Sequence, residues 1–255
     1  MDGIHANIIA ERLVEWAGVP ITNTLLMSWI VLFLLITGAV ITKYRIRLIP
    51  GKAQVFLELL IGTAYDYVEE VLESKTLARR FFPFLMTIFL FILTANMLEF
   101  IPGVGSLGFF TEGHGEFIPL LRSLSTDLNM PLALAIIAFI VIEVAGMRTF
   151  GFFRYVGRFF PFGAFRHGIG AGLLALLVGM IELVSEFIRL ISFSFRLFGN
   201  IFAGEVLIAV ALFFTPYIIP VPFMAFEVFV GFIQAAIFAM LTLFFIKLAV
   251  TEAAH

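Results

Sequence analysis

The sequence predicts an all-α polytopic membrane protein with five membrane-crossing helices, the last two long and strongly tilted, and one amphipathic helix on the membrane surface. Composition is the first observation behind this class: of 255 residues, 62% are hydrophobic and only 13% are charged. A soluble domain has roughly 45–50% apolar and about 25% charged residues. The net charge of −2 offers no basic surface for nucleic acid, and the lack of cysteine excludes disulfides and thiolate metal sites. We therefore expect a single membrane domain over residues 1–255 that uses no metal or other cofactor.

The length of the apolar runs is the second observation. A helix needs about 20 residues to cross a hydrocarbon core of ~30 Å. Runs near this length extend from Asn23 to Thr42, Pro83 to Ile101 and Pro131 to Met147, and two longer runs follow, from Leu173 to Phe214 and from Phe223 to Val250. They divide the domain into an N-terminal section (residues 1–81), a helical hairpin (82–167) and a tilted hairpin (168–255).

Two segments lie outside these runs. Residues 1–20 lack the positive n-region of a signal peptide, and their apolar residues recur at helical spacing, which predicts a surface-lying segment. The segment from Gln54 to Arg80 has an apolar side and an acidic side. This pattern predicts an amphipathic helix on the inner membrane surface or against a partner helix, and a solvated acidic face is the alternative.

The distribution of lysine and arginine is the third observation. Seven lie between the first two runs and four between the third and fourth, whereas the other side holds only Arg12 and Arg122. Because positively charged loops remain in the cytoplasm, we expect the N-terminus outside and the C-terminus in the cytoplasm, in a bacterial inner membrane.

The fourth run, Leu173 to Phe214, is too long for an upright helix. As one helix it would be ~63 Å long and would need a tilt of roughly 60° to fit the membrane. Either it lies steeply aslant, or it folds back near Gly199–Asn200 as a re-entrant pair. We prefer the slanted helix, because no charged loop supports the fold-back.

This fourth run carries polar side chains, which are costly at membrane depth and therefore indicate function. One face is formed by Ser185, Arg189, Ser192, Arg196 and Asn200, and Glu182 lies close to the same line. Glu205 lies on the opposite face, ~13 Å from Arg196 along the helix axis. We therefore expect Arg196 and Glu205 to face different compartments.

The last run adds Glu227 and Gln234, which share one face. Since the two runs are antiparallel, we expect Gln234 beside Arg196 and Glu227 beside Glu205. An arginine does not release its proton at accessible pH, whereas a carboxylate can do so. A fixed cation between carboxylate-lined polar routes is the arrangement expected of a two-access ion path with a barrier in the middle.

For three other ionisable residues, a structural role is an alternative to a role in the ion path. Arg189 pairs with Glu186 or Glu182 in the structural interpretation. Glu143 either lines the ion path or forms an interhelical hydrogen bond. Glu99, at the outer end of its run, is interpreted as interfacial.

The stretch from Arg196 to Glu205, RLFGNIFAGE, resembles the signature of subunit a of F-type ATP synthases. Glu182 and Ser192 precede the arginine at the distances typical of the family, and Gln234 falls in a similar Gln-Ala-x-Ile-Phe stretch.

The resemblance extends to the outer loop, with one departure. Asp127 and Asn129 resemble a polar pair that the family places at its outer entrance. Many members pair a histidine with a carboxylate at the positions of Glu205 and Glu227, where this chain has two glutamates.

The resemblance implies a stator subunit of the F0 rotary motor, not an enzyme by itself, because ATP chemistry belongs to F1 subunits. The implied partners are a c-ring, the subunit b peripheral stalk, the F1 sector and the lipid membrane. Arg196 would separate two aqueous half-channels, and Gln234 would position it. Protons would enter past Glu205 and Glu227 and leave past Glu182 and Ser192, with Asn200 lining the approach. The transported ion would be H⁺, and Na⁺ stays open because the ring carboxylate largely decides it.

A stand-alone ion-coupled secondary transporter or channel is the alternative function. Such proteins are usually built from two related halves with interrupted helices. The sequence has no such repeat, which favours the stator subunit.

Overall fold

The computed structural model describes residues 12–16, 19–101, 104, 108–110, 117–161, 163–164, 168–215 and 218–251. Within these ranges the chain forms seven helices and four short strands. Five of the described helices are long and apolar enough to cross a membrane. The prediction of an all-α polytopic membrane protein is therefore confirmed.

Two short strands precede the first membrane helix. β1 (Arg12–Trp16) pairs with β2 (Val19–Thr22) in an antiparallel hairpin. The helical spacing of the apolar residues in this segment therefore does not correspond to a helix over these strands, because in so short a run the pairing partner outweighs the apolar period. Residues 1–11 lie outside the described residues. The Thr22 hydroxyl then accepts a hydrogen bond from the Leu25 backbone N–H at 3.2 Å, which caps α1 (Asn23–Arg45).

The predicted surface helix over residues 54–80 is wrong at its C-terminal end. The structure has two helices here, α2 (Lys52–Leu72) and α3 (Lys75–Leu98). Glu73 takes a left-handed conformation, with φ of 52°, and this ends α2. Ser74 then caps α3 by accepting a hydrogen bond from the Leu77 backbone N–H at 3.4 Å. The break contains no glycine or proline, so no local signal in the sequence predicts it.

The loop after α3, called the outer loop after its predicted side, contains a second hairpin formed by β4 (Gly108–Phe110) and β5 (Phe117–Pro119). α4 (Asn129–Phe150) then runs back toward the opposite side, which is predicted to be the inner one, and is followed by the short α5 (Phe152–Phe159). Between these helices Gly151 has φ of 84°, a conformation that glycine adopts without strain, and the chain changes direction there.

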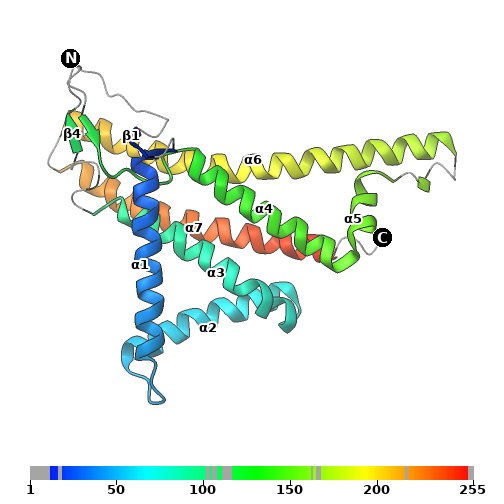
Figure 1. The fold of residues 1–255 in the computed structure, drawn as a ribbon, viewed down its shortest axis with the longest axis horizontal. Helices are drawn as coiled ribbons and strands as arrows, with labels where there is room; N and C mark the ends of the chain where they lie inside the picture. The colour runs from blue at the N-terminus through cyan, green and yellow to red at the C-terminus, as the bar shows by residue number, and fades with distance from the viewer. Residues whose placement is uncertain are drawn as a thin grey trace.

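The two C-terminal helices dominate the molecule. α6 (Ile169–Phe214) is one unbroken helix of 46 residues, or about 69 Å. This continuity excludes a fold-back near Gly199–Asn200. α7 (Pro220–Thr251) follows it. In Figure 1, α6 and α7 run across the view while α1 runs down it, so both are strongly inclined to α1. They lie together near the turn that joins them and diverge toward their other ends, where α4 and α5 lie between them (Figure 1).

Packing is organised around α3 and α7. α7 contacts α2, α3, α4 and α6. Three clusters of buried apolar residues follow one another along α3. The inner cluster joins α2, α3, α4 and α7, the middle one joins α3, α4, α6 and α7, and the outer one joins α1, α3 and the outer loop. The middle cluster contains Phe193 and Leu197, so it fixes α6 against α7 at the level of Arg196.

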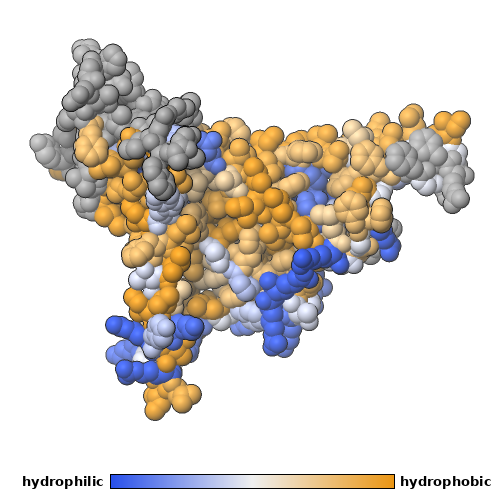
Figure 2. Space-filling view, viewed as in Figure 1, coloured by the Kyte–Doolittle hydropathy of each residue, from blue (hydrophilic) through white to orange (hydrophobic). Residues whose placement is uncertain are grey.

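Much of the remaining surface is apolar, as a membrane protein requires. Figure 2 shows this surface spread over α4 and α6, with polar surface at the end of α1 that leads into α2 and where α2 meets α3. Large apolar side chains of α6 are exposed, among them Leu174, Ile188 and Phe195. Contact with lipid or with partner helices is the environment that stabilises such a surface.

Candidate functional site

Arg196 lies near the middle of the described length of α6, beside Gln234 of α7. Its guanidinium donates a hydrogen bond to the Ser192 hydroxyl at 3.4 Å. Arg196 and Gln234 line one small pocket together with Phe193 and Phe238. Gln234 therefore lies beside Arg196, as the antiparallel arrangement of the two helices predicts. Among the residues that the structure describes, no carboxylate forms an ion pair with Arg196.

Glu227 of α7 lies against the backbone of α6 next to Glu205. A β-carbon added to Gly204 would lie 2.0 Å from the Glu227 carboxyl carbon, so only glycine leaves room for this carboxyl group. Glu227 is 4% exposed. Within the described part of the chain, Glu227 Oε1 and Glu205 Oε2 are buried without a hydrogen-bond partner. The structure thus brings both acids to one level, as the register predicts.

Asp127 and Asn129 belong to a hydrogen-bond network at the outer end of α1. Asp127 is 3% exposed and accepts a hydrogen bond from the Thr24 hydroxyl at 3.0 Å. Asn129 donates to Asp127 Oδ1 from its backbone N–H at 3.1 Å and from its side chain at 2.9 Å. These bonds fix the start of α4 on α1.

Glu182 lies in the inner half of α6 and pairs with Arg158 of α5. Arg158 Nε is 2.8 Å from Glu182 Oε1, and Arg158 Nη2 is 3.2 Å from Glu186 Oε1. Arg189 Nη1 is 2.7 Å from Glu186 Oε2, so of the two predicted partners Arg189 takes Glu186. From the sequence, Arg158 was expected only as one of the four positive charges between the third and fourth apolar runs, and its pairing with Glu182 was not predicted.

Glu143 of α4 faces this inner group of charges. Tyr155 of α5 forms a hydrogen bond with its side chain. Burial raises the pKa of the Tyr155 phenol, with Glu143 acting in the same direction, so the phenol keeps its proton and acts as the donor. The interhelical hydrogen bond, one of the two predicted interpretations of Glu143, is therefore present. Glu143 Oε1 is buried without a described partner.

The polar contacts around Asn96, at the outer end of α3, were not predicted from the sequence. Asn96 is 1% exposed, donates to the Gly231 carbonyl of α7 at 3.0 Å and accepts from the Ser125 hydroxyl at 2.7 Å. Ser123 donates to Glu99 Oε2 at 2.7 Å. Asn96 and Glu99 lie one helical turn apart near the end of an apolar run, and this spacing could have indicated a polar contact.

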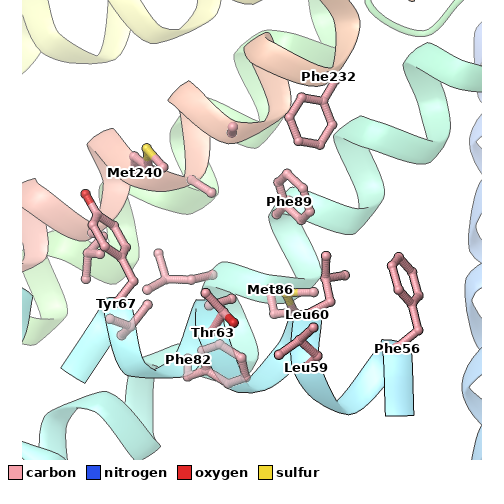
Figure 3. A pocket seen from close by; sticks show the side chains of 16 residues that line it. Phe56, Leu59, Leu60, Thr63, Tyr67, Phe82, Met86, Phe89, Phe232 and Met240 are labelled. Carbon is pink, nitrogen blue, oxygen red and sulfur yellow. The ribbon is translucent and has the colours of Figure 1, made fainter. Parts of the chain in front are cut away.

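A groove of about 540 Å³ lies between α2, α3 and α7. Figure 3 shows the aromatic and aliphatic side chains that line it, including Phe56, Phe89 and Phe232. None of the residues that line it is charged, so it does not belong to the ion path.

Comparison with known proteins assigns the family. The chain matches the family described as "ATP synthase A chain" over residues 25–247. The chain belongs to this family. It is 34% identical to ATP synthase subunit a of Mycobacterium bovis over 246 residues, which cover 92% of this chain and 89% of that protein. It is 31% identical to a protein of Propionigenium modestum named "ATP synthase subunit a, sodium ion specific"; the match covers 93% of this chain and 77% of that protein. It is 28% identical to ATP synthase subunit a of Moorella thermoacetica; the match covers 89% of this chain and 90% of that protein.

Membership in the ATP synthase subunit a family defines the general role of the chain. It is an ion-translocating subunit of the membrane F0 sector, and it associates with other ATP synthase subunits. Its five apolar helices give it a multi-pass membrane location.

Proposed function

We propose that this chain is the stator subunit of the F0 rotary motor and separates two aqueous half-channels with Arg196. The supporting observation is the environment of Arg196. Its charge is permanent, it lies beside Gln234, and no described carboxylate of this chain pairs with it. A cation at membrane depth needs a partner, and the carboxylates of a c-ring supply one as they pass along α6.

The outer half-channel in this proposal is lined by Glu205 and Glu227, with Asp127 and Asn129 at its entrance. Glu227 lies against Gly204, the residue before Glu205, and each glutamate has a buried oxygen with no described partner. A carboxylate accepts a proton by forming one O–H bond and releases it by breaking that bond. Such a pair can accept a proton from outside and pass it to the ring.

The inner half-channel is lined by Glu182 and Ser192, with Glu143 beside it and Asn200 on the approach to the arginine. Glu182 forms an ion pair with Arg158, and a carboxylate in this half of α6 can accept a proton that leaves the ring. Arg196, between the two routes, prevents direct flow because it cannot carry a proton onward.

The remaining parts of the proposal concern partners and orientation. The chain contacts a c-ring, is held by the subunit b peripheral stalk, and works with an F1 sector that performs the ATP chemistry, so it is not an enzyme by itself. It lies in a bacterial inner membrane with its N-terminus outside and its C-terminus in the cytoplasm. The eleven inner-side lysine and arginine residues against two support this orientation.

The Arg196→Ala variant tests the barrier. We expect the assembled complex to lose ATP-driven ion pumping in inverted membrane vesicles while all subunits are still present after purification. The matched control is Arg148→Ala, which removes an exposed arginine at the inner end of α4. Normal pumping by the Arg196→Ala complex would refute the barrier.

The transported ion is tested separately. We propose H⁺, because the outer pair consists of carboxylates that exchange protons. One relative is named as sodium ion specific, so the measurement must compare both ions. We expect ATP hydrolysis by the purified complex to be equal with and without millimolar Na⁺ near neutral pH. Several-fold stimulation by Na⁺ would overturn the assignment to protons.

A further inference from the structure

We propose that Arg158 of α5 is a positioning residue of the inner half-channel, which holds the Glu182 carboxylate where a proton from the c-ring reaches it. The inference rests on the proposed function, in which Glu182 accepts that proton, and adds a residue from outside the two tilted helices. Arg158 takes no part in the transfer, because a guanidinium keeps its proton. Glu182 forms one O–H bond when it accepts the proton and breaks that bond when water at the inner side takes it, so no co-reactant is needed.

Close packing fixes α5 between α4 and α6. A β-carbon added to Gly146 of α4 would overlap the Tyr155 ring, and one added to Gly179 of α6 would overlap the Phe159 carbonyl oxygen. Tyr155 and Phe159 are both buried. Arg158 lies between these two residues in the sequence, so the backbone that carries it is held on both sides.

The same two aromatic residues hold the Arg158 guanidinium. Its central carbon is 5.0 Å from the centre of the Tyr155 ring and 4.9 Å from the centre of the Phe159 ring. Both distances are within the range of cation–π attraction. A planar guanidinium can lie over a ring and still direct its N–H groups at two carboxylates, whereas a lysine ammonium is a single point of charge. The surroundings of this side chain therefore suit an arginine.

Arg158 lies between two glutamates of α6. Glu182 and Glu186 are four residues apart on one face of the helix, where like charges repel. Arg158 Nε is 2.8 Å from Glu182 Oε1, and Arg158 Nη2 is 3.2 Å from Glu186 Oε1. The Glu186 side chain is 7% exposed and the Glu182 side chain is 33% exposed. The buried glutamate thus anchors the arginine, and the arginine in turn holds the glutamate that water can reach.

Arg189 completes the anchor. Its Nη1 is 2.7 Å from Glu186 Oε2, and its guanidinium carbon is 3.9 Å from the centre of the Phe245 ring of α7. Glu186 therefore has one guanidinium on each of its oxygens. This arrangement suits a fixed anion, and it leaves Glu182 as the carboxylate that exchanges protons.

The balance of charge in this group also leaves room for one proton. The charged and titratable side chains around Glu182 are Glu143 of α4, Tyr155 and Arg158 of α5, and Glu186 and Arg189 of α6, while Lys247 of α7 pairs with Glu73 at 3.2 Å. Three carboxylates (Glu143, Glu182 and Glu186) thus face two guanidiniums, so one negative charge is in excess. A partly buried group of charges is more stable when it is balanced, and one added proton balances it.

The test is passive proton flow through F0 in inverted vesicles stripped of F1, measured per assembled complex while the pH of the bath, which meets the inner side, is varied. We expect Arg158→Gln to reduce the flow by about tenfold to 100-fold, because the acceptor is misplaced, and to shift its dependence on bath pH as Glu182→Gln does. Arg158→Lys keeps the positive charge and should restore part of the flow. The matched control is Arg154→Gln, which removes an exposed arginine from the same helix and should change neither rate nor pH dependence.

The double variant Arg158→Gln/Glu182→Gln separates positioning from an independent role. If Arg158 acts through Glu182, the double variant should have the flow of Glu182→Gln alone. Losses that multiply would overturn the inference, as would a slower flow in Arg158→Gln with an unaltered pH dependence, which would show a packing role.

Glu182→Gln, measured alone, distinguishes failure of this inference from failure of the proposed function. If Glu182→Gln reduces the flow and Arg158→Gln leaves it normal, Arg158 does not position the acceptor and the proposed function stands. If Glu182→Gln leaves the flow normal and Arg196→Ala leaves ATP-driven pumping normal, the proposed function itself fails.

Discussion

The absence of a side chain at Gly204 sets the position of the Glu227 carboxyl group. Gly204→Val would put carbon atoms where this carboxyl group lies, since even a β-carbon would come within 2.0 Å of it. Glu227 must then move away from Glu205. We expect ATP-driven pumping in inverted vesicles to fall by about tenfold to 100-fold, because a misplacement of about 1 Å has effects of this size.

The matched control for this prediction is Gly170→Val. Gly170 lies in the first turn of the same helix, and a β-carbon there would meet nothing within 4 Å. Pumping by this variant should be normal. Similar losses in both variants would mean that α6 tolerates no valine, and the contact with Glu227 would not explain the Gly204 result.

Arg158 is a second residue whose replacement has a predictable effect. Arg158→Leu leaves Glu182 and Glu186 without this cation at a site where Glu186 is 7% exposed. Removal of one partner from a buried ion pair costs about 3–5 kcal/mol, and we expect the melting temperature of the purified complex to fall accordingly. Lys75→Gln is the control: its pair with Glu69 spans 3.6 Å with the lysine 78% exposed, so the loss should stay below about 1 kcal/mol. Equal shifts would contradict the prediction.

Residue contacts differed in how well the sequence could predict them. The pairing of Arg196 with Gln234 followed from counting along two antiparallel helices joined by a short turn. The i,i+3 pair of Glu186 and Arg189 is equally local. The pair of Glu182 and Arg158 was not predictable, because the path of the chain between α5 and α6 decides it and no local period encodes that path.

Among the secondary-structure elements, α6 was the most predictable. Its apolar run has no proline, so a helix of this length had to lie aslant. The break at Glu73 was not predictable, because a glutamate rarely takes positive φ and the contacts of α2 and α3 with the inner apolar cluster stabilise it there. The β1–β2 hairpin was missed for a similar reason, since pairing between short segments outweighs their apolar spacing.

The joint between α3 and α7 allows a prediction at the scale of these elements. Asn96→Ala removes hydrogen bonds to the Gly231 carbonyl and from the Ser125 hydroxyl, and should cost about 2 kcal/mol of stability. Ser125→Ala removes one of them and should cost about 1 kcal/mol. Asn96 and Ser125 share one of these hydrogen bonds. We therefore expect the melting temperature of the double variant to be close to that of Asn96→Ala alone. Fully additive losses would show that the two residues act independently.

The whole molecule follows from composition more than from any single contact. Excess apolar residues, few charges and basic loops on one side require a polytopic bundle, and five spans resulted. The arrangement of three apolar clusters along α3 could not be derived in this way, since it depends on which helix faces which.

Orientation in the membrane is the last prediction and concerns the whole chain. The sequence contains no cysteine, so a single introduced cysteine is the only thiol that the chain presents. Phe109→Cys lies in β4 of the outer loop at a position that is 65% exposed, and Lys52→Cys lies at the exposed start of α2. We expect a membrane-impermeant maleimide to label Phe109→Cys from the outer side only and Lys52→Cys in inverted vesicles only. Ile92→Cys, at a position 1% exposed in the middle cluster, should be labelled from neither side. Labelling with the two sides exchanged would overturn the orientation, because it would place the basic loops outside, where translocation of their charge is disfavoured.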